Sequence, residues 1–495
     1  MSKLVVGIDI GTTAIKIIVL DVLSLDKSEI LKVYTTSHNL LSPKPLWAEE
    51  DPLIWKENLY SMLKEVNEDY GKSIEAISVT GMVPTFIALD KDKNPLYNSI
   101  QQNDLRAEDF LTKATNFFEG EENSSYFLKT GSHVNSQHIG YKWQWFIDKF
   151  PEEAKKTKYI VGSYDYIRYL LCGNLNIELN WALESGLWNV KNNCWEDSIL
   201  DYYGIKNEML SEVVASKKIS GTTTEILNIK TGLKIGIPVV AGSADHVVSA
   251  FATGATKLGD LVLKLGGAGD VLFPVDKLTY EDKLFLDYFP SSNCPFVLNG
   301  CTASSGSLLK WFKNEFANED FKELDEKAAL LPAGSDGVVV LPYFIGEKTP
   351  IFDAKARGVI YGLTLSHTKI HIYRAMLESI AFAFLHHQEV LKNKGLSVDR
   401  IFITNGGSTS PLWRQIMADV FQKDVYYIKY NPGSCLGAAF LAGMGIGILN
   451  ENVIEHFTEQ KLVSYTNSKN YDIYEKNYYI YRNLYKSLYP LFHKE

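Results

Sequence analysis

Short apolar runs alternate with longer amphipathic segments along the chain. Residues 4–10 and 14–20 are rich in β-branched side chains and flank a Gly-Thr-Thr turn, a pattern that is typical of a hairpin. Apolar positions then recur at helical spacing over residues 53–66, and strand-like runs follow at 74–79 and 86–89. Because such elements alternate to the end of the chain, the pattern predicts an α/β fold.

The opening hairpin pattern recurs just past the midpoint of the chain. A run at residues 261–265 that is apolar except for Lys264 leads into a Gly-Gly-Ala-Gly turn at 266–269, and residues 271–273 are apolar again. Two halves that open in the same way predict a duplicated domain with a cleft between the copies. Hairpins with glycine turns are common, so a chance recurrence is the alternative.

Six tyrosines near the C-terminus recur every three or four residues, which predicts one face of a helix. A face of this kind serves either as a platform for stacking bases or as an aromatic packing surface. The acidic net charge and the lack of a basic run beside it favour packing. The six residues are Tyr471, Tyr474, Tyr478, Tyr481, Tyr485 and Tyr489.

Composition narrows the class of protein. The 495 residues include 50 Lys and Arg against 59 Asp and Glu, for a formal net charge of −9, which argues against nucleic acid or an anionic membrane as a partner. No apolar run approaches the ~20 residues of a membrane span, and the N-terminus lacks the pattern of a signal segment. Five scattered cysteines predict neither a disulfide framework nor a zinc cage. We therefore expect a cytoplasmic enzyme.

The common nucleotide-binding motifs do not occur. Gly71-Lys72-Ser73 resembles the end of a P-loop, but Val66 stands where the first glycine is required. No G-x-G-x-x-G run follows a predicted strand, which argues against a Rossmann site. His367 and His371 have helical spacing, but no Glu follows the first one, so ordinary histidines are favoured over a metal site.

The turn of the first hairpin suits phosphate. A tight turn at residues 11–13 exposes backbone N–H groups and two hydroxyls on one side, where phosphate oxygens could bind. Asp9, at the end of a buried strand, is costly to bury without a partner, and a Mg²⁺ ion held partly through water would remove that cost. A structural aspartate satisfied by the turn amides is the alternative.

Two further segments carry candidate chemistry. In residues 237–250 a buried strand ends in small residues and Asp245 begins an apolar helix, where it could accept a proton from a substrate hydroxyl or serve only as a helix cap. In residues 400–417 a strand leads to Gly406-Gly407 and then to a helix with Ser410 as its N-cap and Pro411 in its first turn. Paired glycines allow a ligand or a backbone to approach closely.

Taken in this order, the segments resemble the FGGY family of carbohydrate kinases, within the actin-like ATPase superfamily. The resemblance runs from Leu4 to about Leu488. The matching segments are the opening hairpin, Asn103-Asp104-Leu105-Arg106-Ala107, Gly242 to Asp245, Gly346-Glu347-Lys348-Thr349-Pro350, and residues 406–416 continued by Leu436-Gly437-Ala438-Ala439.

The resemblance implies an α/β fold of two actin-like (ribonuclease H-like) domains with a central interdomain cleft. The N-terminal domain, residues 1–247, would bind the sugar and carry the first phosphate motif and the catalytic aspartate. The C-terminal domain, residues 248–495, would bind the nucleotide. Relatives are often dimers or tetramers, so a homo-oligomer is among the expected states.

The resemblance also implies ATP-dependent phosphorylation of a sugar or polyol hydroxyl, with Asp245 as the general base and Asp9 as a Mg²⁺ ligand. The residues implied to bind ATP are Gly11, Thr12, Thr13, Lys16, Gly266, Gly267, Gly306, Lys310, Gly406 and Gly407. Those implied to bind the substrate are Val83, Pro84, Gln102, Asn103, Asp104, Arg106 and His246.

Several positions depart from the family pattern. Gly267 stands where many relatives have Thr, Pro84 replaces the His of xylulose kinases, Gln102 replaces an aromatic residue, and His246 replaces an Asn or Gln. We expect a pentulose such as xylulose as substrate, with gluconate, a polyol or another ketose as alternatives. A non-catalytic sugar-binding relative and an actin-like ATPase are hypotheses from other classes.

Overall fold

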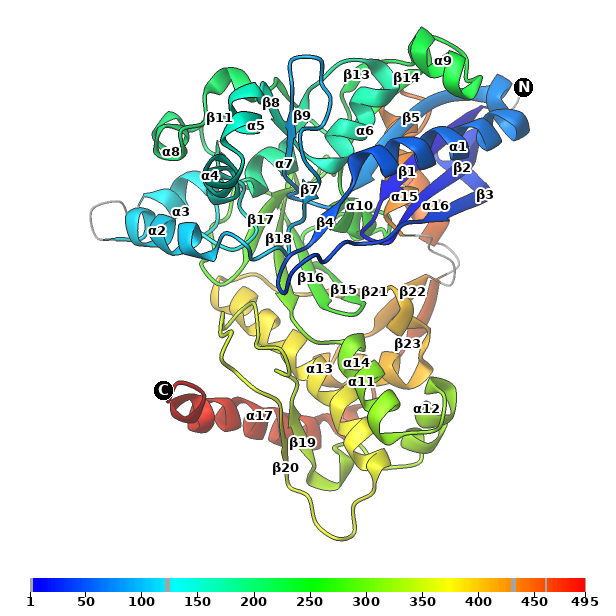
Figure 1. Ribbon diagram of the computed structural model, residues 1–495. Helices are drawn as coiled ribbons and strands as arrows, with labels where there is room; N and C mark the ends of the chain where they lie inside the picture. Colours follow the sequence, from blue (N-terminus) through cyan, green and yellow to red (C-terminus); the bar gives the residue numbers. More distant parts are fainter. Residues whose placement is uncertain (1–2, 121–124, 429–432, 459–460, 495) are drawn as a thin grey trace.

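Two large sheets, each with helices packed against it, form the body of the molecule (Figure 1). The computed structural model describes residues 3–120, 125–428, 433–458 and 461–494. The strands of the first sheet lie before residue 245 and those of the second sheet after residue 259. The α/β class predicted from the alternating pattern is confirmed.

The first sheet has the strand order β13-β14-β5-β1-β2-β3. Strands β1, β5 and β14 run parallel, whereas β2, β3 and β13 run antiparallel to their neighbours. Strands β1 and β5 are buried along nearly their whole length, as is typical of central strands covered by helices. The strands are β1 (Leu4–Ile10), β2 (Ala14–Ser24), β3 (Lys27–Ser37), β5 (Ile74–Gly81), β13 (Ile219–Thr222) and β14 (Pro238–Ala244).

The second sheet has the strand order β17-β18-β16-β15-β21-β22-β23. Here β15, β21 and β22 are parallel, and the remaining pairs are antiparallel. The strands are β15 (Asp260–Leu265), β16 (Gly269–Val275), β17 (Phe285–Tyr288), β18 (Phe296–Thr302), β21 (Arg400–Thr404), β22 (Val425–Ile428) and β23 (Lys461–Ser464).

The other elements cover these sheets or form an insertion beside the first one (Figure 1). The helices are α1 (Pro52–Tyr70), α2 (Glu108–Phe118), α3 (Tyr126–Thr130), α4 (Gly140–Lys149), α5 (Pro151–Lys156), α6 (Ser163–Cys172), α7 (Leu179–Glu184), α8 (Asp197–Tyr203), α9 (Glu225–Thr231), α10 (Asp245–Phe251), α11 (Gly306–Phe316), α12 (Phe321–Ala329), α13 (Lys369–Asn393), α14 (Pro411–Phe421), α15 (Ser434–Gly445), α16 (Asn452–Thr458) and α17 (Tyr471–Phe492). The short strands are β4 (Glu49–Glu50), β6 (Ile87–Leu89), β7 (Ser99–Ile100), β8 (Tyr159–Val161), β9 (Ile177–Glu178), β10 (Trp188–Asn189), β11 (Cys194–Trp195), β12 (Val213–Val214), β19 (Val339–Leu341) and β20 (Val359–Tyr361).

The two predicted hairpins form as expected and occupy equivalent places. Each consists of two antiparallel strands joined by a glycine-containing turn, β1 with β2 in the first sheet and β15 with β16 in the second. In each sheet the first hairpin strand also pairs in parallel with a strand from later in the chain, β5 or β21. The repeated pattern in the sequence therefore corresponds to a repeated structure.

Helix α15 returns from the C-terminal half of the chain and packs against the first sheet. It lies against β1 and β5 and beside α10, and α16 follows it against β3 (Figure 1, in orange beside the blue strands). Glycines permit this close approach: a Cβ on Gly7 would lie 2.0 Å from the carbonyl oxygen of Cys435, and one on Gly437 would lie 2.2 Å from that of Val248. The predicted domain boundary between residues 247 and 248 falls inside α10 and stays a prediction.

The tyrosine-rich segment forms the predicted helix, α17. Tyr474 and Tyr481 are buried, and the Tyr481 hydroxyl lies 2.5 Å from that of Tyr343, so the helix face serves for packing. None of the five cysteines, which all lie in the described ranges, belongs to a disulfide bond. Among the described helices, none combines the length and the apolar character that a membrane crossing needs.

Gly7→Ala should destabilise the fold by about 1–3 kcal/mol or more, because the new methyl group would meet the backbone of α15 rather than a flexible side chain. Urea unfolding measures the effect. Gly267→Ala is the matched control, since no described atom lies within 4 Å of a Cβ placed there. Equal stability of the two variants would contradict the close packing of α15 on β1.

Candidate functional site

A cleft of about 830 Å³ opens between the two sheets, where the two hairpins face each other. Its walls come from the ends of β1 and β15, the β15–β16 turn, the first residues of α10, α11 and α15, and the glycine turn at residues 405–407. These segments are far apart in the sequence, so only the fold brings them together. The predicted central cleft is therefore present.

Asp9, the second-to-last residue of β1, lines this cleft. Its Oδ2 accepts a hydrogen bond of 2.7 Å from the hydroxyl of Ser434, the first residue of α15. Its Oδ1 is shielded from solvent and has no hydrogen-bond partner among the described residues. Burial and the nearby charge of Asp245 raise the pKa of Asp9 to about 7, although Ser434, Lys16 and Lys264 act in the opposite direction. A buried carboxyl oxygen without a partner is a place where a cation fits.

Asp245 opens α10 and lines the same cleft. Strand β14 ends at Ala244, directly before it. Within that strand Gly242 has a φ of +76°, and a Cβ placed there would lie 1.7 Å from the carbonyl oxygen of Val79, so no side chain fits at that position. The Asp245 side chain is 37% exposed, and its Oδ1 accepts a 2.6 Å hydrogen bond from the backbone N–H of His246. It is therefore both fixed in direction and open to a ligand.

The far wall of the cleft is bare backbone. A Cβ placed on Gly267, Gly406 or Gly433 would meet no described atom within 4 Å, so these positions leave free space beside the main chain. The β15–β16 turn, which contains Gly266 and Gly267, is held in place by two hydrogen bonds. The backbone N–H groups of Ser305 and Gly306 donate to the carbonyl oxygens of Gly267 and Gly266. Such a surface accommodates bulky polar groups such as phosphates.

A second, largely apolar cavity of about 750 Å³ adjoins this wall. It shares Gly306, Phe321, Gly406 and Gly407 with the main cleft and extends between α11, α12, α13 and α14. Side chains of Leu309, Tyr373, Leu377 and Trp413 line it further in. Its size and apolar lining suit a flat aromatic group attached to whatever binds along the glycines.

The predicted ATP-binding residues occupy different parts of this region. Lys16, Gly266, Gly267, Gly306, Lys310, Gly406 and Gly407 line the main cleft. Gly11, Thr12 and Thr13 form the β1–β2 turn and are not among the described residues that line it. The roles of all ten in binding ATP stay predictions.

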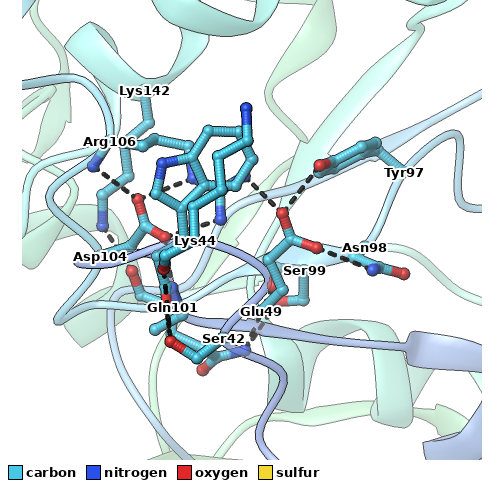
Figure 2. A network of polar contacts seen from close by, with 12 residues as sticks. Ser42, Lys44, Glu49, Tyr97, Asn98, Ser99, Gln101, Asp104, Arg106 and Lys142 are labelled. Carbon is cyan, nitrogen blue, oxygen red and sulfur yellow. Dashed lines mark hydrogen bonds and ion pairs between the residues drawn. The ribbon is translucent and has the colours of Figure 1, made fainter.

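The predicted sugar loop is held by a buried network of ionic contacts (Figure 2). Asp104 and Arg106 have side chains with no solvent exposure, and two nitrogens of the guanidinium donate to the carboxylate at 2.8 and 2.7 Å. Arg106 also pairs with Glu49 at 2.5 Å and stacks 3.9 Å from the ring centroid of Trp47. Asp104 accepts a further hydrogen bond from the backbone N–H of Ala48. This network fixes the loop, and direct contact of either side chain with a sugar stays a prediction.

Lys142 ties the same loop to a neighbouring one. Its buried ammonium donates to the carbonyl oxygen of Gln101 at 2.8 Å (Figure 2). It also donates to the carbonyl oxygens of Gln102 and Gln137, at 3.4 and 3.3 Å. Burial lowers its pKa to about 7. The contacts leave the side chain of Gln102 half-buried and that of Asn103 exposed.

The other predicted substrate residues lie in two places. Val83 and Pro84 are buried in the loop that follows β5. His246 lies next to Asp245, with its Nε2 3.1 Å from Asp287 and 3.9 Å from Glu184. Although burial lowers the pKa of His246, these carboxyl groups raise it well above its usual value.

The ligand atoms of Glu184, His246 and Asp287 lie within 4.8 Å of one another, a donor set that could also hold a metal ion. Glu184 is half-buried, and burial together with the charge of Asp287 raises its pKa well above the usual range. Both carboxyl groups are missing from the sequence prediction, because they belong to α7 and β17 and no local motif marks them.

Comparison with known proteins shows the family of the chain that forms this cleft. The model of the N-terminal domain of the FGGY family of carbohydrate kinases matches residues 4–252, and that of the C-terminal domain matches residues 280–446. The chain belongs to the FGGY family of carbohydrate kinases. It therefore has the two-domain actin-like fold of that family and is a phosphotransferase with an alcohol group as acceptor.

The similarity to individual FGGY kinases extends over whole chains. The structure of a xylulose kinase from Rhodospirillum rubrum is 36% identical, superposes with a TM-score of 0.91, and covers 99% of this chain and all of its own. A xylulose kinase of Bacillus subtilis is 28% identical over 98% of this chain and 97% of its own. A gluconokinase of the same organism is also 28% identical, over 89% of this chain and 87% of its own.

The cleft fits the nucleotide that an FGGY kinase uses. The open glycine backbone beside an apolar cavity matches a triphosphate joined to a flat base. The partnerless Oδ1 of Asp9 fits a Mg²⁺ ion, which supplies charge neutralisation at the phosphates when bound. Phe321 and Tyr373 line the apolar cavity but are missing from the site residues predicted from the sequence, because they lie on helices outside any glycine motif.

Asp9→Asn should stabilise the metal-free protein at pH 8 but not at pH 4.5. An unfolded aspartate has a pKa near 3.9 and the folded one about 7, so stability falls as the pH rises between those values, by up to about 4 kcal/mol. Asparagine removes this loss and can still accept the bond from Ser434. Urea unfolding at both pH values measures the difference.

The same experiment with added Mg²⁺ provides the control. The metal should stabilise the wild-type protein at pH 8 and leave Asp9→Asn unchanged. A variant that is less stable than the wild type at pH 8 would contradict a buried Asp9 carboxyl group whose Oδ1 has no partner among the described residues.

Proposed function

We propose that the protein transfers the γ-phosphoryl group of ATP to a hydroxyl of a neutral ketose, with a pentulose such as xylulose as the first candidate. The observation that carries this proposal is the position of Asp245. Its side chain is 37% exposed and lies at the start of a helix, in the cleft that the glycine turns and Asp9 also line. Carbohydrate kinases need one carboxylate at this meeting point of donor and acceptor.

In the proposed reaction Asp245 accepts the proton of the sugar hydroxyl as its oxygen bonds to the γ-phosphorus. The bond to the bridging oxygen breaks at the same phosphorus, and ADP leaves with that electron pair. The hydrogen bond from the N–H of His246 holds the Asp245 carboxyl group in one direction. Mg²⁺, when bound near Asp9, would neutralise phosphate charge.

The acidic surroundings of His246 favour a neutral acceptor over gluconate. Glu184, Asp245 and Asp287 surround one imidazole. The raised pKa of Glu184 means that burial and the charge of Asp287 already disfavour a further negative charge there. A gluconate carboxylate would meet the same field, whereas the hydroxyls of a ketose would find hydrogen-bond partners.

We further propose that Asp104, Arg106 and Lys142 act on the sugar indirectly, by fixing the loop that carries Gln102 and Asn103. Their contacts are almost wholly within the protein, which supports a positioning role. Five cysteines without a disulfide bond among the described residues support a reducing compartment such as the cytoplasm.

Asp245→Asn should lower kcat for ADP release by about 10²–10⁴-fold, because the amide cannot accept the hydroxyl proton. The KM values for ATP and sugar should change much less. A coupled assay of ADP release with D-xylulose, D-ribulose, fructose, glycerol and gluconate measures both the loss and the preference. Asp276→Asn, an exposed aspartate changed in the same way, is the matched control.

The wild-type protein should release ADP fastest with a pentulose and slowly without any acceptor. Faster turnover with gluconate than with every ketose would contradict the acceptor proposed here. If no acceptor stimulates ADP release, or if Asp245→Asn is silent, the proposed function is wrong.

A further inference from the structure

The second hairpin carries a lysine that the family resemblance does not assign to the site. Lys264 is the second-to-last residue of β15 and lines the cleft together with Asp9 and Asp245. Its side chain is 11% exposed, and its ammonium lies 3.1 Å from the carboxylate of Asp270, the residue directly opposite on β16. A buried lysine that faces a phosphate-sized space needs an explanation beyond packing.

The two hairpins carry the same kind of charge pair with the signs exchanged. In the first hairpin Asp9 on the leading strand stands opposite Lys16 on the returning strand. In the second hairpin Lys264 leads and Asp270 returns. Lys264 therefore occupies the place in its hairpin that Asp9 occupies in the other, and the two side chains reach the cleft from opposite sheets.

The charge of Lys264 acts at the centre of the cleft. It lowers the pKa of Asp9, as does Lys16. Burial alone would lower the pKa of Lys264, but Asp270 and Asp245 outweigh this effect and raise it. Lys264 thus lines the same cleft as both carboxyl groups, and its charge influences Asp9 while that of Asp245 influences Lys264.

The turn beside Lys264 has no side chain that could do the same work. Gly267 leaves open space, and Ser307 turns its hydroxyl back to donate to the carbonyl oxygen of Gly267 at 2.8 Å. Asp270 is 28% exposed, so water can solvate its carboxylate when the lysine turns away. If the Lys264 ammonium exchanged the Asp270 carboxylate for a phosphate oxygen, it would keep a charge-assisted hydrogen bond to an anion.

We propose that Lys264 leaves Asp270 on nucleotide binding and pairs with the γ-phosphoryl group of ATP, where it stabilises the charge of the transferring group. This inference rests on the proposed kinase function, but its main test needs no sugar. A lysine at that point distinguishes ATP from ADP, since only ATP presents a γ-phosphate.

The test compares the affinity of ADP with that of the β,γ-imido analogue of ATP by calorimetry in the presence of Mg²⁺. Lys264→Met should lose about tenfold to a hundredfold affinity for the analogue, the range expected for a hydrogen bond to a charged group, and less than threefold for ADP. Lys264→Arg should recover most of the loss. With the sugar identified by the acceptor panel, kcat of Lys264→Met should fall about 10²–10³-fold with little change in the sugar KM.

Two further variants separate the loss of the phosphate contact from effects on folding and on overall charge. Lys264→Met leaves Asp270 without its partner, so Lys264→Met/Asp270→Asn removes both charges and should keep the same selective loss if the single variant folds poorly. Lys277→Met, an exposed lysine just past β16, is the matched control and should bind both nucleotides as the wild type does.

Equal losses of affinity for ADP and for the analogue would overturn the proposal. Lys264 would then have only a structural role, as the partner of Asp270 between β15 and β16. A loss confined to sugar affinity would overturn it as well and place Lys264 in the acceptor site. Neither result depends on whether a pentulose is the true acceptor, so failure of this inference is distinguishable from failure of the proposed function.

Discussion

The constraint on which the structure depends is that two carboxyl groups must face one cleft from the ends of parallel strands. Asp9 lies one residue before the end of β1 and Asp245 directly follows β14, and both strands run parallel to β5 in the first sheet. Parallel strands end at the same edge, so this topology delivers both groups to one place. Their mutual repulsion contributes to the raised pKa of Asp9, and a cation bound beside the two carboxyl groups would relieve this repulsion.

The rest of the fold serves to supply positive charge and space at that edge. The second sheet brings its own hairpin against the first, and the lining of the cleft contains three lysines, Lys16, Lys264 and Lys310, against two aspartates. A protein with a net charge of −9 thus presents a local excess of positive charge where phosphates would bind. Helix α15 links the halves, because it packs on the first sheet and donates through Ser434 to Asp9.

Sequence reasoning succeeds where the chemistry is local. The glycine turns, the helix start at Asp245 and the capped helix after Gly407 are each contained in a short window, and each forms as predicted. It fails where partners meet across strands: Asp270 becomes visible as the partner of Lys264 only when the register of β15 and β16 is known.

The loop at residues 102–106 is the instructive intermediate case. The family resemblance implies that this loop contacts the sugar, and polar groups do gather there. The carboxylate of Asp104 is nevertheless occupied by Arg106 and Ala48, because a buried charge must be paired before it can do anything else. No short window shows whether a polar side chain binds a ligand or holds the loop that does.

Direct titration of the Asp9 carboxyl group tests the central claim most directly. Carbon-13 NMR of the protein labelled at aspartate carboxyl groups, with Asp9→Asn to assign the signal, reports its pKa in the metal-free state and with Mg²⁺ and nucleotide. The two-carboxylate cleft predicts a value of about 7 without metal and a clear fall when Mg²⁺ and nucleotide bind. A value near 4 in the metal-free protein, unchanged on loading, would contradict it.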